Sequence, residues 1–181
     1  MYVPSSTGVL TIARLKTIEI ALHWRWALML ALCTVLLAKY VFPARVPDWD
    51  AATAWSTSVA AVLACEVALL LHELSHALVA RGRGVHVQRI VFHGLVAETE
   101  LGRGTSPRHE VLIALVGPVM NLGLAATAQA VRLAFMTSGP GDVVLMLLII
   151  GNLAAATMSL LPFGASDGAR ALQALRGRDY P

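Results

Sequence analysis

Charged residues are scarce in this sequence. Asp, Glu, Lys and Arg make up only 14% of the 181 residues, while 57% are hydrophobic and the mean hydropathy is +0.68. A soluble domain of this size needs a more polar surface, since about 25% of the residues in such domains are charged. The composition therefore excludes an ordinary soluble domain and predicts an integral membrane protein.

Cysteine is equally rare, and its two positions, Cys33 and Cys65, lie in apolar segments. They provide neither a disulfide framework nor a Cys-x-x-Cys motif, so we expect small core residues. The net charge of +3 does not require a nucleic-acid partner, because the cytoplasmic loops of membrane proteins carry the same excess of Lys and Arg. We therefore expect the chain to interact with the lipid bilayer and with no nucleic acid.

Apolar stretches long enough to cross a bilayer, which takes about 20 residues, occupy residues 24–42, 54–80, 110–135 and 143–161. Eleven of the 14 Lys and Arg residues lie before or at the start of the first stretch, between the second and third, or after the fourth. This asymmetry predicts a multi-pass protein of the cell (inner) membrane with cytoplasmic N- and C-termini. No signal peptide is expected, because Arg14, Lys16 and Glu19 interrupt the N-terminal region.

The connection between the second and third stretches predicts β-structure. Residues 85–92 and 95–101 are rich in strand-forming residues and are separated by His93-Gly94, which indicates a β-hairpin over residues 85–101. Alternation of apolar and more polar residues over 18–22 predicts another short strand. The expected fold is an all-α polytopic membrane protein with about four transmembrane helices, a small membrane-associated β-hairpin or sheet, and a single domain over residues 1–181.

In the second apolar stretch, the long apolar run over residues 54–71 ends in His72-Glu73-Leu74-Ser75-His76. On a helix, two histidines four residues apart share one face and can bind one Zn²⁺, while the Glu between them reaches a metal-bound water. The alternatives are a chance match and a pair of hydrogen-bonded core histidines on a soluble helix. The apolar setting favours a functional site, because Glu and His are costly inside a bilayer.

A catalytic zinc site needs a third protein ligand, for which Asp167 is the candidate. Pro162 must end the fourth apolar helix, and Ser166 or Asp167 can begin a short amphipathic helix over residues 168–176. A carboxylate in the first helical turn is also explained as a plain helix cap. However, a broken helix carrying an acid at membrane depth is tolerated mainly where it lines a cavity.

Taken together, these segments resemble the site-2 protease family of intramembrane zinc metalloproteases (peptidase family M50) over nearly the whole chain. The resemblance rests on the HExxH segment at 72–76, the similar G-P-x-x-N segment at 117–121, the P…D-G-x-R segment at 162–170, and His23-Trp24 before the first span. The chain departs from the family at Ser159, where an Asn is usual, and at Gly164, in a stretch where a second Pro is usual. Ser159 offers a single, shorter donor.

The resemblance implies a zinc-dependent endopeptidase that cleaves a peptide bond in or next to a transmembrane segment. One Zn²⁺ per chain would be held by His72, His76 and Asp167, with Glu73 as general base. Asn121 is a candidate to orient the substrate or the oxyanion, and plain helix packing is the alternative. Ser159 is a weaker candidate for the same role. Asn152 lies two turns earlier on the helix of Ser159, and a helix–helix hydrogen bond would explain it equally well.

Two other functions stay open at this point. A zinc transporter would need a second polar helix and usually internal repeats, neither of which the sequence shows. A catalytically inactive relative that binds membrane proteins is disfavoured by the intact Glu73. The expected partner is a single-pass transmembrane substrate, such as an anti-sigma factor or a precursor of a transcription factor. The hairpin over 85–101 could bind it by strand addition, and the alternative is a hairpin that only covers the site. The sequence does not indicate an oligomeric state.

Overall fold

The computed structural model describes residues 8–15, 18–102 and 106–177. Residues 1–7 and Lys16, on which the signal-peptide and charge predictions partly rest, lie outside the described residues. The elements in chain order are β1 (Val9–Leu15), β2 (Ile18–His23), α1 (Trp24–Leu36), the π-helical turn η1 (Leu37–Val41), α2 (Phe42–Arg45), α3 (Ala51–Gly82), β3 (Val87–Phe92), β4 (Ala97–Leu101), α4 (Pro107–Phe135), α5 (Gly139–Leu160) and α6 (Asp167–Leu175).

In the described part of the chain, four helical segments are long and apolar enough to cross a membrane. They are Trp24–Arg45, Ala51–Gly82, Pro107–Phe135 and Gly139–Leu160. The predicted fold class is confirmed, with helix ends a few residues from the expected ones. At about 1.5 Å per residue, α3 is about 48 Å long, so it extends beyond a hydrocarbon core of about 30 Å.

Side-chain caps fix the starts of the helices. Asp50 Oδ1 accepts a hydrogen bond from Thr53 N at 2.7 Å at the start of α3, and Ser106 caps α4 ahead of Pro107. Both residues satisfy backbone N–H groups that the first helical turn leaves unpaired. The starts of α3 and α4 are therefore determined by residues next to them in the sequence.

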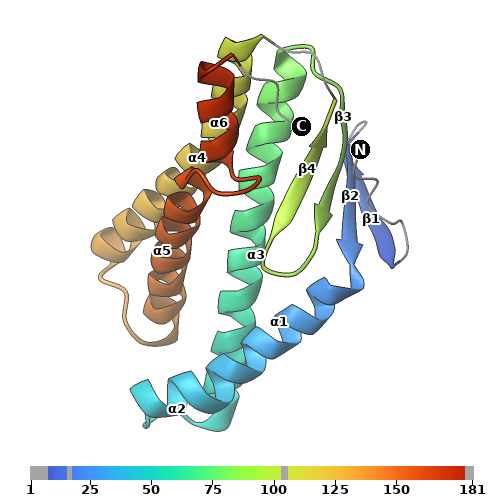
Figure 1. Ribbon diagram of the computed structural model, residues 1–181. Coiled ribbons are helices and arrows are strands. Elements are labelled where there is room, and N and C mark those ends of the chain that lie inside the picture. Colours follow the sequence, from blue (N-terminus) through green and yellow to red (C-terminus); the bar gives the residue numbers. More distant parts are fainter. Residues whose placement is uncertain (1–7, 16–17, 103–105, 178–181) are drawn as a thin grey trace.

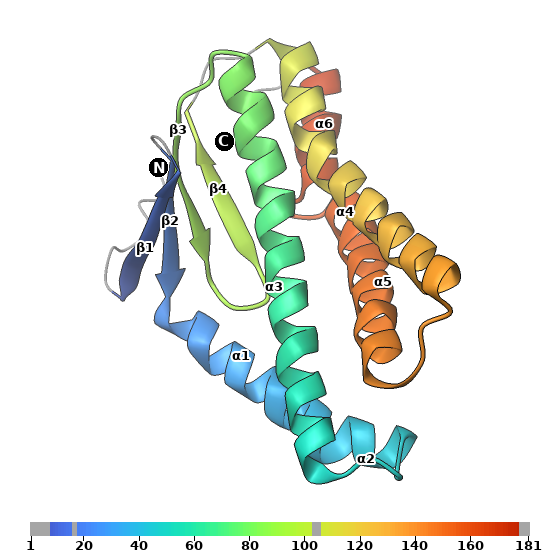
Figure 2. The same cartoon turned by 180° about the vertical axis from the view of Figure 1, so that it is seen from behind.

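A four-stranded sheet in the order β1-β2-β3-β4 lies along one side of α3, and α4, α5 and α6 lie on the other side (Figures 1 and 2). The predicted hairpin is formed by the antiparallel strands β3 and β4, and the predicted strand over 18–22 is β2. β2 pairs in parallel with β3, and β1, which the sequence analysis did not predict, pairs with β2.

The core lies between the sheet and the C-terminal half of α3. Ile18, Ile90 and Ile113 are almost fully buried there, against Ala77 and Ala80 of α3. Alanines on α3 allow the strands and α4 to approach the helix backbone closely, as small residues do in membrane proteins. This packing fixes the part of α3 that contains residues 72–76.

Candidate metal centre

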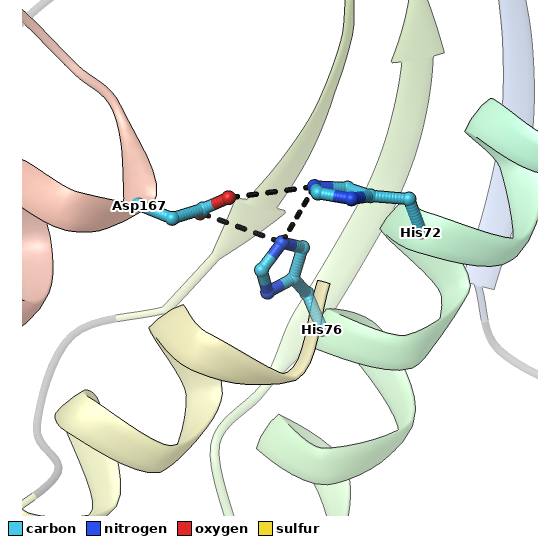
Figure 3. A group of neighbouring side chains, drawn as sticks. All are labelled: His72, His76 and Asp167. Atoms are coloured by element: carbon cyan, nitrogen blue, oxygen red, sulfur yellow. Dashed lines mark hydrogen bonds and ion pairs between the residues drawn. The ribbon is translucent and has the colours of Figure 1, made fainter. Parts of the chain in front are cut away.

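Two histidines of α3 face each other inside the helix bundle (Figure 3). His72 Nε2 and His76 Nε2 are 3.1 Å apart, and both side chains are buried. Their spacing of four residues places both rings on one face of the helix. The edge-to-face arrangement of the rings, with centroids 4.8 Å apart, directs the two Nε2 atoms to one point.

Asp167 approaches this pair from the first turn of α6 (Figure 3). Its Oδ2 is 3.4 Å from His72 Nε2 and its Oδ1 is 3.4 Å from His76 Nε2. Burial favours the neutral acid, but hydrogen bonding to both histidines outweighs it and lowers the pKa of the Asp167 carboxyl to about 2. Asp167 is therefore a carboxylate at neutral pH, the form in which it can bind a cation.

The break between α5 and α6 places Asp167. The last turn of α5 ends before Pro162, and Ser166 caps α6 by accepting a hydrogen bond from Ala169 N at 3.2 Å. Gly168 allows the two helices to meet, because a Cβ atom there would lie 1.9 Å from the carbonyl oxygen of Leu160. The predicted short helix is present over Asp167–Leu175, with Ser166 as its N-cap.

The donor set fits a tetrahedral zinc ion. Ligand atoms at about 2.0 Å from a tetrahedral Zn²⁺ are about 3.3 Å from one another. His72 Nε2 and His76 Nε2 are 3.1 Å apart, and each lies 3.4 Å from a different oxygen of the Asp167 carboxylate. With one ligand atom taken from each residue, the three atoms lie within 4.8 Å of one another. Two imidazoles and one carboxylate are also a ligand set found in catalytic zinc sites with an open fourth position.

A backbone contact orients one of the histidines. His76 Nδ1 lies 2.6 Å from the carbonyl oxygen of Ile113 on α4, to which a protonated Nδ1 donates. That tautomer leaves the Nε2 lone pair free to bind a metal. His72 Nδ1 is buried and has no such partner among the described residues.

α4 packs against the histidines through Gly117. A Cβ atom at this position would lie 2.2 Å from His76 Nε2 and 2.6 Å from His72 Nε2. Both distances are far below van der Waals contact, so only glycine leaves room for the two rings. The G-P-x-x-N segment thus has a steric role at its first residue, which the sequence analysis did not identify.

Glu73 is buried beside the histidines and contacts the sheet. Thr99 of β4 donates a hydrogen bond from Oγ1 to Glu73 Oε2 at 2.7 Å. Thr99 Oγ1 also lies 3.2 Å from the backbone carbonyl oxygen of Glu73. The sequence analysis missed Thr99, because its 26-residue separation from Glu73 gives no local signal. The contact holds the Glu73 carboxylate in one orientation. It also places Thr99 of β4 beside Glu73 of α3.

An ion pair connects α6 to α4. Arg170 Nη2 lies 2.5 Å and Arg170 Nε 3.2 Å from Glu110 Oε1, and both side chains are largely buried. Arg170 is one turn beyond Asp167 in the same helix. The sequence analysis did not single out Glu110, although a charge early in an apolar helix is a usable signal.

The three other predicted residues lie apart from the histidines and Asp167. Asn121 and Asn152 are buried and line a cavity of about 150 Å³ between α3, α4 and α5. Ser159 Oγ donates to the Ala156 carbonyl oxygen at 3.2 Å within its own helix. Glu66 of α3 lines the same cavity and accepts a hydrogen bond from Trp26 Nε1 at 2.8 Å.

Comparisons with known proteins give two kinds of relatives. The chain is 31% identical over 174 residues to the putative zinc metalloprotease Rip3 of Mycobacterium tuberculosis, matching 93% of this chain and 44% of that protein. It is 29% identical over 153 residues to the putative zinc metalloprotease sll0528 of Synechocystis, matching 83% of this chain and 39% of that protein. The chain thus spans less than half the length of these curated relatives.

Among solved structures, the site-2 protease from Methanocaldococcus jannaschii has the same fold. The TM-score is 0.69 at 20% sequence identity, and the match covers 95% of this chain and 73% of that one. No protein-family model matches the chain.

Proposed function

We propose that this chain, which belongs to the site-2 protease family, is a zinc-dependent intramembrane endopeptidase in a single domain over residues 1–181. The observation that carries the proposal is the convergence of His72, His76 and Asp167, with buried Glu73 beside them, inside a bundle of membrane-spanning helices. Carboxylates and histidines at such depth are seldom only structural.

His72, His76 and Asp167 would hold one Zn²⁺ per chain. When bound, zinc supplies Lewis acidity toward a carbonyl group and lowers the pKa of water toward neutrality. Asp167 contributes the negative charge of the ligand set, and the Ile113 carbonyl holds the His76 ring in its orientation. Removing any one ligand would leave two, which is too few for a stable zinc site.

Glu73 would act as general base in the hydrolysis of a peptide bond. Its carboxylate takes the proton of the attacking water and passes it to the leaving amine. The hydrogen bond from Thr99 limits the carboxylate to one orientation. Asn121 is our candidate for orienting the substrate or the oxyanion, with Asn152 and Ser159 as weaker candidates.

The substrate would bind in extended form, because a helix shields its own backbone from attack. Within the described sheet, β4 pairs only with β3, which leaves its other edge available for strand addition. Thr99 places this edge at the level of Glu73. The expected substrate is a single-pass transmembrane protein, such as a membrane-tethered anti-sigma factor.

The charge asymmetry of the loops supports an inner-membrane location with cytoplasmic N- and C-termini. His72 and His76 are 10 and 6 residues before the end of α3 at Gly82. At 1.5 Å per residue, the centre is then about 9 to 15 Å from the cytoplasmic end of that helix. Hydrolysis would occur below the membrane surface on the cytoplasmic side.

The test is cleavage of a single-pass model peptide in liposomes by the zinc-loaded chain. We expect cleavage within the apolar segment, loss on adding 1,10-phenanthroline, and recovery with zinc. Glu73→Gln should abolish cleavage, while Glu19→Gln, on β2 and remote from the histidines, should not. Cleavage that persists in Glu73→Gln, or no cleavage by the zinc-loaded wild type, would contradict the proposal.

A further inference from the structure

The cavity of about 150 Å³ between α3, α4 and α5 is not explained by the metal centre. Its walls are mostly apolar, but Glu66, Asn121 and Asn152 line it from three different helices. Leu95, in the turn between β3 and β4, closes one side. Figures 1 and 2 both show this turn lying against the middle of α3.

These polar groups have hydrogen-bonding capacity left over. Within the described part of the chain, the buried Asn121 side chain has no hydrogen bond. Asn152 donates through Nδ2 to the Leu148 carbonyl oxygen at 2.8 Å, which leaves its Oδ1 as an acceptor. Glu66 accepts the Trp26 hydrogen bond through Oε2, which leaves Oε1 as an acceptor. In the described part of the chain, His72 Nδ1 is the fully buried side-chain polar atom without a partner, so the amide atoms of Asn121 keep some exposure. They are therefore available to hydrogen-bond a polar occupant of the cavity.

The cavity is close to the metal centre along both α3 and α4. Asn121 is one helical turn from Gly117, which packs on both histidines, and Glu66 is two turns from Glu73. These separations are about 6 and 10 Å along the helices. At about 3.3 Å per residue of an extended chain, these separations correspond to about two to three residues from the scissile bond.

We propose that this cavity is a substrate subsite that admits a primary amide side chain, Asn or Gln, about two to three residues from the scissile bond. The proposal rests on the proposed function, whose site it extends. The amide N–H groups would donate to Glu66 and Asn152 Oδ1, and the amide oxygen would accept from Asn121 Nδ2. A cavity of about 150 Å³ is large enough for benzene, so it has room for this group.

The bilayer makes this recognition selective. An amide side chain of a transmembrane segment has no water to bind in lipid, so a preformed set of partners favours its transfer into the cavity. A leucine in the same place would leave Asn121 and one Glu66 oxygen without partners. Asn also weakens a helix, which favours the extended form at this point.

The native Cys65 lines the cavity and reports its occupancy. Cys33→Ser leaves Cys65 as the single thiol of the chain, and Glu73→Gln prevents hydrolysis. The probe is a single-pass Leu/Ala peptide with one central Asn, in detergent micelles, and its control has Leu at that position. We expect the Asn peptide to slow the reaction of Cys65 with methyl methanethiosulfonate about fivefold, as one hydrogen bond allows, and the Leu peptide to leave it unchanged.

Two variants identify the group responsible. Glu66→Leu should erase the difference between the two peptides. Trp26→Phe breaks the same Trp26–Glu66 hydrogen bond but keeps the carboxylate, so it should retain the difference. Equal protection by both peptides, protection that survives Glu66→Leu, or loss in both variants would overturn the proposal. The rate of Cys65 modification is measured in a variant that does not hydrolyse the peptide. A negative result therefore contradicts the subsite alone, whereas a negative liposome cleavage assay contradicts the proposed function.

Discussion

Gly117→Ala should destroy the metal centre while leaving the helix intact. The new Cβ atom would lie 2.2 Å from His76 Nε2 and 2.6 Å from His72 Nε2. Non-bonded heavy atoms keep about 3.5 Å apart, so the rings must retreat by about 1 Å. Metal–ligand distances tolerate only about 0.2 Å. Since disturbing a supporting residue alone costs 10- to 100-fold in metal affinity, we expect a loss of at least about 100-fold.

Zinc affinity is measured by competition with a chromophoric chelator in detergent. Gly123→Ala is the matched control, because it lies on the same helix and a Cβ atom there meets nothing within 4 Å. Its zinc affinity should equal that of the wild type. Overpacking costs about 1 to 3 kcal/mol, so Gly117→Ala should still fold, which its helical circular dichroism would show. Zinc affinity within a few-fold of wild type in Gly117→Ala would refute the steric account.

The remaining predictions concern the groups around the ligands. Thr99→Val removes the hydrogen bond to Glu73 without changing side-chain shape, so turnover should fall about tenfold at unchanged zinc content; normal turnover would refute the contact's role. Glu110→Gln weakens the pair with Arg170 and should lower zinc affinity about tenfold, whereas Glu98→Gln, an exposed acid on β4, should not. Gly168→Ala should displace α6 and abolish zinc binding, since its Cβ would meet the Leu160 carbonyl; retained binding would contradict this.

The membrane spans could be predicted because length and hydropathy are local properties of the chain. Three strands of the sheet, β2, β3 and β4, could be predicted as well, since His93-Gly94 marks the turn of a hairpin and residues 18–22 alternate. The parallel pairing of β2 with β3 could not be predicted, because it joins Glu19 to Arg89, which are separated by the whole of α1, α2 and α3. β1 gave no clear signal, since it is an exposed strand with little burial to impose alternation.

Some residues of the candidate site could likewise be predicted from the sequence, and others could not. His72, Glu73 and His76 follow from spacing along one helix, and Asp167 follows from a helix break next to an acid. Thr99 contacts Glu73 from a distant strand, so no spacing could indicate it. Glu110 stands out as a charge early in an apolar helix, but its pairing with Arg170 of α6 could not be predicted. The steric role of Gly117 likewise depends on how closely α4 packs on α3, which only coordinates give.

The most direct test of the account is the zinc content of detergent-purified protein for wild type, His72→Ala, Asp167→Ala and Glu73→Gln. We expect about one zinc per chain in the wild type, as a three-ligand site with an open position binds. His72→Ala and Asp167→Ala should lose most of it, and Glu73→Gln should retain it. A wild type without zinc, or an Asp167→Ala variant that keeps its full zinc content, would contradict the assignment of the metal centre.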